Sequence, residues 1–533
     1  MRNEQAAGYA AAAAGFLSGA PAALLTVSGP GAIHAIAGVS HAATNCWPML
    51  LLSGSAEVGE LGKGAFQELD QVAALRPFCK YAASVPSVGD VGRVLAQALR
   101  ATAMGRPGPA YVDLPTNMLL SRATPSFSFL HPLIPERVRA PAASVAAAVA
   151  LLKTAQRPLL ITGKGAAYSG AEKEVQQLSN RFGLPVLGTS MGRGLLPDGH
   201  PLCVNAARST ALAKSDVAIV VGARLNWMLH FAEPPRWAPD VRIILVDAQP
   251  SERDASVAAA TLMGDARVVM GQLLQEVLAQ GLNPSAWRPW VQQLTTKAHA
   301  ATQSLARRLS SAPSSPLEYY GALGVLRHAL QNLMPAPLVI SEGANTMDMA
   351  RLILPVRAPR TRLDAGTWGT MGVGLGFAVA AAATAHSSNP QQLVVAVEGD
   401  SAFGFSGMEL ETLVRYRLPM VVLVMNNAGI YGGDRRPDAL AVAAQRGMQA
   451  GGFASDPSPT AFVPYARHDQ VMSAFGGKGL RATSVPELQD AIAAAIHSAL
   501  QDKVPALIDV ILDPMAGVES GNVHSFNAPK AKL

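Results

Sequence analysis

Two short polar motifs in the last third of the chain contain residue types that can hold a metal ion. Glu398-Gly-Asp-Ser401 follows one apolar run, and Asn426-Asn-Ala-Gly429 follows a second one. If both runs are parallel strands of one sheet, Asp400 and Asn427 lie together at its carboxyl edge. One carboxylate, one amide oxygen and a backbone carbonyl leave octahedral positions for two phosphate oxygens and water, an arrangement that suits Mg²⁺ on a diphosphate. The two motifs together predict such a site.

Either motif alone is most often an ordinary turn after a strand. Their separation and their shared position after apolar runs favour a joint site. Gly399 permits close approach of a ligand to the backbone. A helix that follows Asp400 would point its positive amino end at the phosphates.

Such a site requires a parallel sheet, and the chain contains three segments with the pattern of one. Short apolar runs that end in Ser, Gly, Asp or Pro alternate with helix-like stretches, which is typical of βα units. We predict an α/β protein in which three domains, each a mainly parallel sheet flanked by helices, span residues 1–122, 140–296 and 319–512. Linkers are predicted over 125–141 and 296–318, and residues 513–533 are predicted to form a mobile tail.

Individual strands are expected where the apolar runs are most continuous. They are predicted at 23–27, 49–52 and 110–114, then at 158–162, 218–221 and 243–246, and finally at 338–340, 393–397, 420–425 and 506–511. Residues 365–385 are long enough to cross a bilayer but hold five glycines, so we predict a buried helix after a Gly-rich loop and no membrane insertion.

Composition excludes several classes of protein. The chain has 533 residues, of which 49% are hydrophobic and 15% charged, with 3 cysteines and a formal charge of +6. This excludes a disordered chain and a disulfide scaffold, and the cysteines indicate a reducing compartment. The basic residues are scattered, so no nucleic-acid groove is predicted and small anionic ligands are the expected partners.

The Asp400 and Asn427 motifs resemble the signature of thiamine diphosphate enzymes. Within these enzymes, four segments resemble the 2-hydroxyacyl-CoA lyase and oxalyl-CoA decarboxylase family, and they are residues 2–7, 341–348, 362–372 and 399–409. The similarity covers essentially the whole chain. It implies an amino-terminal pyrimidine-binding domain, a central domain for the ADP part of coenzyme A and a carboxy-terminal diphosphate-binding domain. It also implies a cofactor held between two subunits, hence a homodimer or homotetramer.

The resemblance assigns roles to individual residues. Glu4 would be the catalytic carboxylate that hydrogen-bonds the aminopyrimidine ring and drives ylid formation, since a carboxyl in a dry site can match the basicity of a ring nitrogen. Mg²⁺ would be held by Asp400, Asn427 and the carbonyl of Gly429. Cofactor contacts are implied for Asn345, Thr370, Met371, Ser401, Ala402 and Tyr431. Of these, Met371 would prop the cofactor into its bent shape, a role that a core methionine can fill.

In the central domain, the resemblance implies a nucleotide site for coenzyme A, with ADP as a second candidate ligand. The residues implied are Lys164, Arg208, Arg224, Asp247 and Asp265. Each could instead be a surface charge at a strand end.

The cofactor motifs do not separate two reactions, because loss of CO₂ from oxalyl-CoA and loss of an aldehyde from a 2-hydroxyacyl-CoA both leave formyl-CoA. The loop 64–71 carries Phe66 and Gln67 where the decarboxylases resemble one another in having Tyr-Glu. An apolar Phe suits an alkyl or aldehyde group better than a carboxylate, which favours the lyase, as in plant-type members. Residues 513–521 resemble the closing segment of the decarboxylase.

The two ends of the chain lead to two further expectations. Family members begin with a strand and a helix before the Arg2-Asn-Glu-Gln5 segment, so the amino-terminal domain is expected to be truncated, and a catalytically weak CoA-binding or partner subunit is the alternative to an enzyme. Ala531-Lys532-Leu533 is similar to a peroxisomal address, which predicts the peroxisome, and otherwise the cytoplasm.

Overall fold

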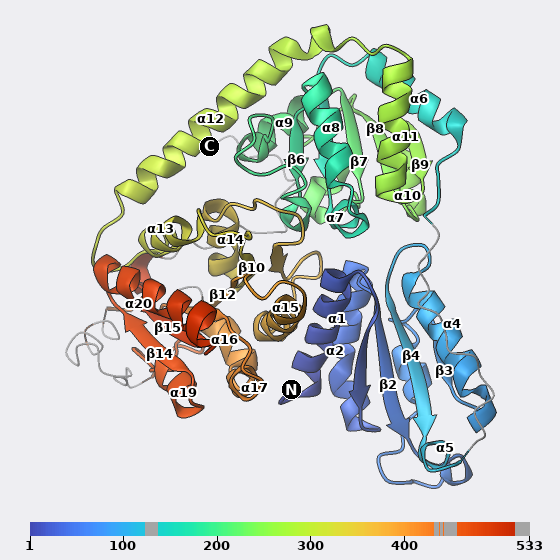
Figure 1. Ribbon diagram of the computed structural model, residues 1–533, viewed down its shortest axis with the longest axis vertical. Helices are drawn as coiled ribbons and strands as arrows, with labels where there is room; N and C mark the ends of the chain where they lie inside the picture. Colours follow the sequence, from blue (N-terminus) through green and yellow to red (C-terminus); the bar gives the residue numbers. More distant parts are fainter. Residues whose placement is uncertain (123–136, 431–435, 438–440, 442–455, 517–533) are drawn as a thin grey trace.

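Three parallel sheets, each covered by helices, build the molecule (Figure 1). The computed structural model describes residues 1–122, 137–430, 436–437, 441 and 456–516. All strand pairs within the three sheets are parallel. The predicted α/β organisation is therefore confirmed, and all ten predicted strands are found, with starts within one residue and ends within three residues of the expected positions.

The amino-terminal unit is a sheet of order β1-β2-β4-β3. Neighbouring residues of β2 point to opposite faces, so Leu51 packs with helices α1 and α2 while Leu50 packs with α4. Its elements are α1 (Glu4–Ser18), β1 (Ala22–Thr26), α2 (Pro30–Asn45), β2 (Met49–Ser55), α3 (Gln71–Leu75), β3 (Ala82–Ser84), α4 (Val91–Ala103), β4 (Pro109–Pro115) and α5 (Thr116–Leu119).

The central unit is a sheet of order β6-β5-β7-β8-β9. Leu160 of β5 faces α6, α8 and α11, and Leu159 faces α9 and α12. Its elements are α6 (Ala142–Lys153), β5 (Pro158–Thr162), α7 (Lys164–Ser169), α8 (Glu172–Phe182), β6 (Val186–Gly188), α9 (Arg208–Lys214), β7 (Val217–Val221), β8 (Arg242–Asp247), α10 (Glu252–Val257), β9 (Ala260–Met263), α11 (Ala266–Ala279) and α12 (Arg288–Ser310).

The segment predicted as a linker over 296–318 is helical for most of its length, because α12 continues to Ser310. Trp290, Leu294 and Ala298 recur every four residues and are buried, which gives this helix a continuous apolar contact with the central unit. The helix ends where the serine run begins. In Figure 1 it crosses from the central to the carboxy-terminal unit.

The carboxy-terminal unit is a sheet of order β11-β10-β12-β13-β15-β14. The central strands are almost entirely apolar because helices cover both faces. Its elements are α13 (Tyr319–Leu330), β10 (Leu338–Glu342), α14 (Ala344–Ile353), β11 (Arg362–Asp364), α15 (Gly374–Ser388), β12 (Val394–Gly399), α16 (Asp400–Ser406), α17 (Glu409–Arg415), β13 (Val421–Asn426), α19 (His468–Ala474), β14 (Lys478–Ala482), α20 (Val485–His497) and β15 (Ala506–Ile511).

The predicted buried helix after a Gly-rich loop is α15, which packs on α1 (Figure 1). Small residues allow α1 to pack closely on both α15 and α2: a Cβ on Gly376 of α15 would come within 2.8 Å of the carbonyl of Ala6, and one on Gly38 of α2 within 2.4 Å of Gly8 Cα. The outer units thus share one core beside these helices. Among the described helices, we find none with the length and apolar character needed to cross a membrane.

Candidate active site

The two predicted metal-binding motifs lie at the ends of adjacent strands. β12 pairs with β13, with Gly399 opposite Met425, so both chains leave the sheet at the same edge. The backbone N–H of Gly429 donates to Asp400 Oδ2 at 2.8 Å, and that of Ser401 donates to Oδ1 at 2.8 Å. Asp400 and Asn427 are both buried. The structure therefore brings Asp400, Asn427 and Gly429 together.

The electrostatics of Asp400 fit a cation. Burial raises the pKa of Asp400 to about 6, and the N–H groups of Gly429 and Ser401 oppose that shift by stabilising the charge. The described residues contain no group of three His, Cys, Asp or Glu side chains that could bind a metal. A cation here would thus take one carboxylate, an amide and a carbonyl oxygen from the protein, with phosphate and water oxygens completing the shell.

The first asparagine of the Asn-Asn pair holds the turn. Asn426 Nδ2 donates to Asp509 Oδ1 at 3.0 Å and to the carbonyl of Ala466 at 3.2 Å, while its Oδ1 accepts the N–H of Ala428 at 3.2 Å. Ala428 has a φ of 62°, a left-handed conformation that this bond supports. Sequence reasoning missed the role of Asn426, because its partner Asp509 lies on β15.

The loop between β11 and α15 carries the predicted cofactor residues Thr370 and Met371, both partly exposed. Glu342, at the end of β10, accepts the backbone N–H groups of Gly372 and Gly374, the latter at 2.5 Å. The hydroxyl of Thr370 is buried and has no hydrogen-bond partner among the described residues. A polar ligand group could therefore pair with it.

Two glutamates form an unexpected pair behind this loop. Glu342 of β10 stands directly opposite Glu398 of β12, and a Cβ on Gly374 would meet an oxygen of each. Burial raises the pKa of Glu342 to about 7, and burial together with Glu342 raises the pKa of Glu398 well above its usual range. Within the described part of the chain, the carboxyl oxygens of Glu398 have no partner.

Further predicted cofactor residues lie on helices that begin at this edge. Asn345 is the second residue of α14 and is buried. Ser401 and Ala402 are the second and third residues of α16. Tyr431 lies outside the described residues, as does Ala531-Lys532-Leu533.

Glu4 begins α1 and is held in place by the residues before it. Asn3 caps the helix through its side chain, which accepts the N–H of Ala6 at 2.8 Å, and the N–H of Arg2 donates to Glu409 Oε1 at 2.7 Å. One oxygen of Glu4 lies 3.4 Å from His34 Nδ1. These described contacts do not join Glu4 to the strand ends that carry Asp400 and Asn427.

The loop with Phe66 and Gln67 projects from the amino-terminal unit. Phe66 is 85% exposed, and Gln67 has a left-handed φ of 54°. The hydroxyl of Ser28 donates to Gln67 Oε1 at 3.0 Å, and the backbone of Gln67 lies so close to Gly29 that a Cβ there would approach its carbonyl to 2.6 Å. Gln67 is therefore fixed while Phe66 remains available.

Gln71, which sequence reasoning missed, anchors this loop from behind. Its Oε1 accepts the N–H of Gly29 at 2.5 Å, and its Nε2 donates to Asp113 Oδ1 at 2.6 Å and to the Tyr111 hydroxyl at 2.9 Å. The only local signal is a polar residue at the start of a short helix, which does not reveal a buried network.

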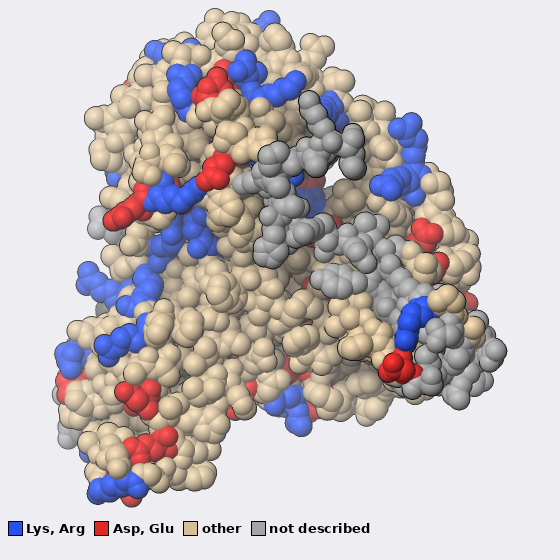
Figure 2. All heavy atoms as spheres, turned by 180° about the vertical axis from the view of Figure 1, so that it is seen from behind, with Lys and Arg blue, Asp and Glu red and all other residues tan. Residues whose placement is uncertain are grey.

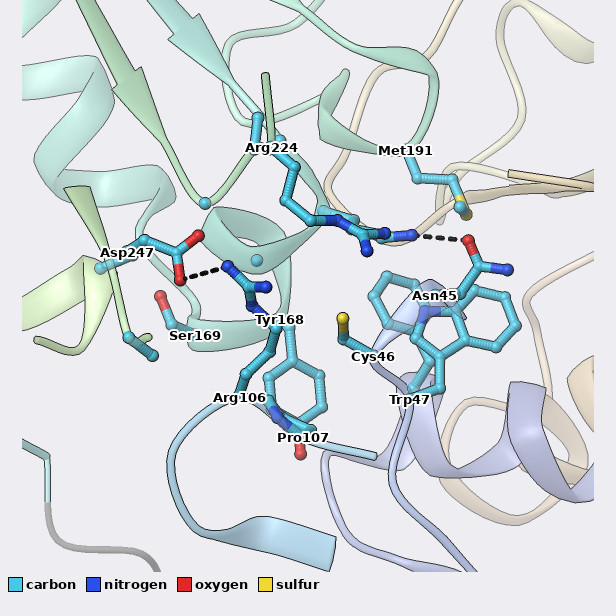
Figure 3. Close-up of a pocket in the computed structure, with 18 of the residues that line it drawn as sticks. Asn45, Cys46, Trp47, Arg106, Pro107, Tyr168, Ser169, Met191, Arg224 and Asp247 are labelled. Carbon is cyan, nitrogen blue, oxygen red and sulfur yellow. Dashed lines mark hydrogen bonds and ion pairs between the residues drawn. The ribbon is translucent and has the colours of Figure 1, made fainter. Parts of the chain in front are cut away.

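A cavity of about 340 Å³ opens between the central unit and the other two units (Figure 3). It is lined by Lys164, Arg224, Asp247 and Asp265, so the structure brings together four of the five residues predicted for a nucleotide. The fifth, Arg208, does not line the cavity. Its guanidinium donates to the carbonyl of Met228, which is a lining residue.

Charges in the cavity are mostly paired across unit boundaries. Arg106 of the amino-terminal unit donates to Asp247 Oδ1 at 3.0 Å, a contact drawn in Figure 3. Asp265 caps α11 by accepting the N–H of Val268 at 3.1 Å and also pairs with Arg137 at 3.2 Å. Asp265 thus has a structural role here in addition to lining the cavity.

Lys164 is a cavity cation with strongly altered electrostatics. Burial, and to a lesser extent the nearby guanidinium groups of Arg224 and Arg106, lower the pKa of the Lys164 ammonium to about 7. Figure 2 shows Lys and Arg side chains along one side of the reverse face, with Asp and Glu side chains among them.

Comparison with known families places three matches along the chain. The model of the thiamine pyrophosphate enzyme N-terminal binding domain matches residues 1–74, that of the central domain 145–273, and that of the C-terminal binding domain 342–510. Thiamine pyrophosphate is another name for thiamine diphosphate. The first match starts at residue 1, and the expected truncation stays a prediction.

Curated relatives are similar over nearly the whole chain. A 2-hydroxyacyl-CoA lyase of Oryza sativa subsp. japonica is 47% identical, with 99% of this chain and 90% of the relative covered. A 2-hydroxyacyl-CoA lyase 1 of Homo sapiens is 42% identical, with 98% and 89% covered. An oxalyl-CoA decarboxylase of Escherichia coli (strain K12) is 41% identical, with 99% and 90% covered.

Proposed function

The chain belongs to the 2-hydroxyacyl-CoA lyase and oxalyl-CoA decarboxylase family of thiamine diphosphate enzymes, and on this premise we propose that it cleaves a 2-hydroxyacyl-CoA to formyl-CoA and a shortened aldehyde. It is a carbon–carbon lyase, with thiamine diphosphate and Mg²⁺ as cofactors. The observation that carries the proposal is the meeting of Asp400, Asn427 and Gly429 at two adjacent strand ends.

Thiamine diphosphate, when bound, supplies a carbon nucleophile for the thioester carbonyl and takes up the electrons of the bond that breaks. In our proposal Asp400, Asn427 and the Gly429 carbonyl hold Mg²⁺ on the diphosphate. Asn345, Thr370, Ser401 and Ala402 bind the cofactor, and Met371 orients it, with Tyr431 a further candidate. Glu4 holds the proton at the pyrimidine ring.

In the described part of the chain, Glu4 pairs with His34 and not with the strand end at Asp400, which supports a site completed by a second copy of the chain. We therefore propose a homodimer or a homotetramer. We propose the peroxisome as the location of the enzyme, because Ala531-Lys532-Leu533 is similar to a peroxisomal address.

The exposed side chain of Phe66 supports the lyase over the decarboxylase. Cleavage breaks the bond between the thioester carbonyl and the hydroxyl-bearing carbon, whose hydroxyl proton must leave as the aldehyde forms. An apolar ring beside that group favours an alkyl chain over a carboxylate. Gln67, fixed by Ser28, is neutral and can hydrogen-bond the hydroxyl.

An oxalyl-CoA decarboxylase is the second candidate, favoured by the resemblance of residues 513–521. The cavity at Lys164 and Arg224 is the proposed site for the nucleotide part of coenzyme A, and ADP fits the same chemistry.

The test is formyl-CoA release by the purified chain with Mg²⁺ and thiamine diphosphate, given oxalyl-CoA and a long-chain 2-hydroxyacyl-CoA in parallel. Faster turnover of the hydroxyacyl substrate, with aldehyde formed, supports the lyase. Preference for oxalyl-CoA supports the decarboxylase. No product from either substrate, with cofactor binding absent by calorimetry, supports instead the catalytically weak CoA-binding or partner subunit.

A further inference from the structure

Asn45 lies where the three units meet. It is the last residue of α2 and is fully buried, and its side chain faces the cavity beside Trp47 (Figure 3). Its Nδ2 donates to the carbonyl of His41 at 3.2 Å and lies 3.0 Å from His41 Nε2. This leaves its Oδ1 as the acceptor for groups from the other two units.

The first of these groups is in the central unit. Lys164 Nζ donates to Asn45 Oδ1 at 2.6 Å. Lys164 begins α7 directly after β5 and lines the cavity, so the Asn45 carbonyl fixes where the ammonium stands relative to a bound anion.

The second group is in the carboxy-terminal unit. The backbone N–H of Thr367 donates to the same Asn45 Oδ1 at 3.2 Å. Gly366 has a φ of 61°, and a Cβ on it would lie 2.4 Å from that oxygen, so the loop is fitted closely around Asn45. Trp227 Nε1 holds the carbonyl of Thr367 at 3.0 Å. Thr367 stands four residues before Met371 on the same loop.

We propose that Asn45 is a positioning residue whose single carbonyl oxygen fixes both the cavity amine of Lys164 and the backbone of the loop that carries Thr370 and Met371. The inference rests on the proposed function, since it takes that loop to bind the cofactor. Asn45 thereby couples the proposed nucleotide-binding cavity to the proposed cofactor-binding loop.

The test compares Asn45→Leu, Asn45→Asp and Lys164→Met in the full-length chain. Calorimetry measures coenzyme A binding between pH 6 and pH 9, and separately thiamine diphosphate binding with Mg²⁺. Leu removes both hydrogen bonds, Asp keeps both and adds a charge, and Lys164→Met removes only the cavity contact.

Wild-type affinity for coenzyme A is expected to fall as pH rises through about 7, where Lys164 loses its proton. Asn45→Asp moves this midpoint upward by about one pH unit, because a carboxylate stabilises the ammonium, and Asn45→Leu moves it downward. Among the described residues, the other charged or titratable groups that face Lys164 are His41, Cys46, Arg106, Arg224 and Asp364, and these variants leave them unchanged.

Cofactor affinity separates the two contacts. Asn45→Leu is expected to weaken thiamine diphosphate binding about tenfold, the loss of roughly one hydrogen bond to a positioned loop, while Lys164→Met and Asn45→Asp leave it unchanged. Equal cofactor affinity in wild type and Asn45→Leu, or a pH midpoint that Asn45→Asp does not raise, overturns the inference.

If Asn45→Leu fails to fold, Asn45→Ala, which removes the same two hydrogen bonds, replaces it in both measurements, and the midpoint in Asn45→Asp still tests the Lys164 contact. A wild-type chain that binds no thiamine diphosphate contradicts the proposed function instead, which keeps the two failures distinct.

Discussion

The strand ends at Asp400 and the cavity at Lys164 are built in different ways. The first site takes its main residues from two turns that each follow a strand directly, and adjacent strands bring them together. The second takes residues from all three units, and its key contact joins Asn45, Lys164 and Thr367. A site of the first kind is encoded locally and depends on one sheet. A site of the second kind depends on how whole units are packed, so distant changes should disturb it.

Asp400→Ala should give the largest effect on cofactor affinity, and this effect should be confined to the site at the strand ends. Asp400 is the one carboxylate in the donor set, so its loss is expected to lower cofactor affinity by more than about a hundredfold. The fold should be retained, because the substitution also removes the free-energy cost of burying that charge. Calorimetry with Mg²⁺ and thiamine diphosphate measures this, and circular dichroism checks the fold.

Coenzyme A binding to the same variant is the matched control, and it should be unchanged. If Asp400→Ala kept activity without Mg²⁺, the metal assignment would be wrong.

Acid should weaken the fold through the junction of the units, where His41 is buried. Burial lowers the pKa of His41 to about 3, so the folded chain keeps this ring neutral while an unfolded chain takes up a proton below about pH 6.5. The His41 contribution to stability is therefore lost as pH falls from about 6.5 towards 3, by on the order of 2 kcal/mol at pH 5. Glu342 and Asp400, whose pKa values are raised by burial, act in the opposite direction, so the contribution is measured as the difference between wild type and His41→Leu in urea unfolding at pH 7 and pH 5.

His41→Leu should lose less stability than wild type between pH 7 and pH 5, although the variant also loses ring contacts with Trp47 and Phe377 at both pH values. His34→Leu, at an exposed histidine, is the control and should keep the wild-type pH dependence. An unchanged slope in His41→Leu would contradict the assignment.

Arg106→Leu should weaken coenzyme A binding about tenfold. The buried carboxylate of Asp247 would then lack its guanidinium partner in the cavity proposed for the phosphates of coenzyme A. The double variant Arg106→Leu with Asp247→Asn should recover part of the affinity, and the coupling between the two changes is the quantity to measure. Arg93→Leu, which breaks the exposed pair with Asp90, is the control. Additive effects would show that the pair does not act as a unit.

The smallest effect is expected at the projecting loop. Phe66→Tyr combined with Gln67→Glu should shift the ratio of kcat/KM for 2-hydroxyacyl-CoA over oxalyl-CoA by about fivefold towards the oxalyl substrate, since two polar changes on a projecting loop alter substrate preference only modestly. Val58→Tyr, at another exposed residue of the same unit, should leave the ratio unchanged. A shift in the opposite direction would remove the loop from substrate selection.

The sequence predicted what local patterns encode. Apolar runs located the strands, and the turns after β12 and β13 located Asp400 and Asn427. The helix α12 was missed because its exposed second half is polar and runs into serines, which looks like a linker. Gln71 was missed because its role appears only when Asp113 lies beside it, and Asn45 because its partners are more than a hundred residues away.

The helix α12 also sets how the molecule tolerates changes in length. An α-helix rises 1.5 Å and turns about 100° per residue. A single residue inserted between Trp290 and Leu294 would therefore rotate the rest of the helix about its axis and break the buried contacts of Leu294. An insertion among the serines that follow Ser310 would be absorbed by irregular backbone. The connection between the second and third units is thus a helix whose length fixes the rotation of one end relative to the other. Chimeras between family members should therefore be joined after this helix and not within it.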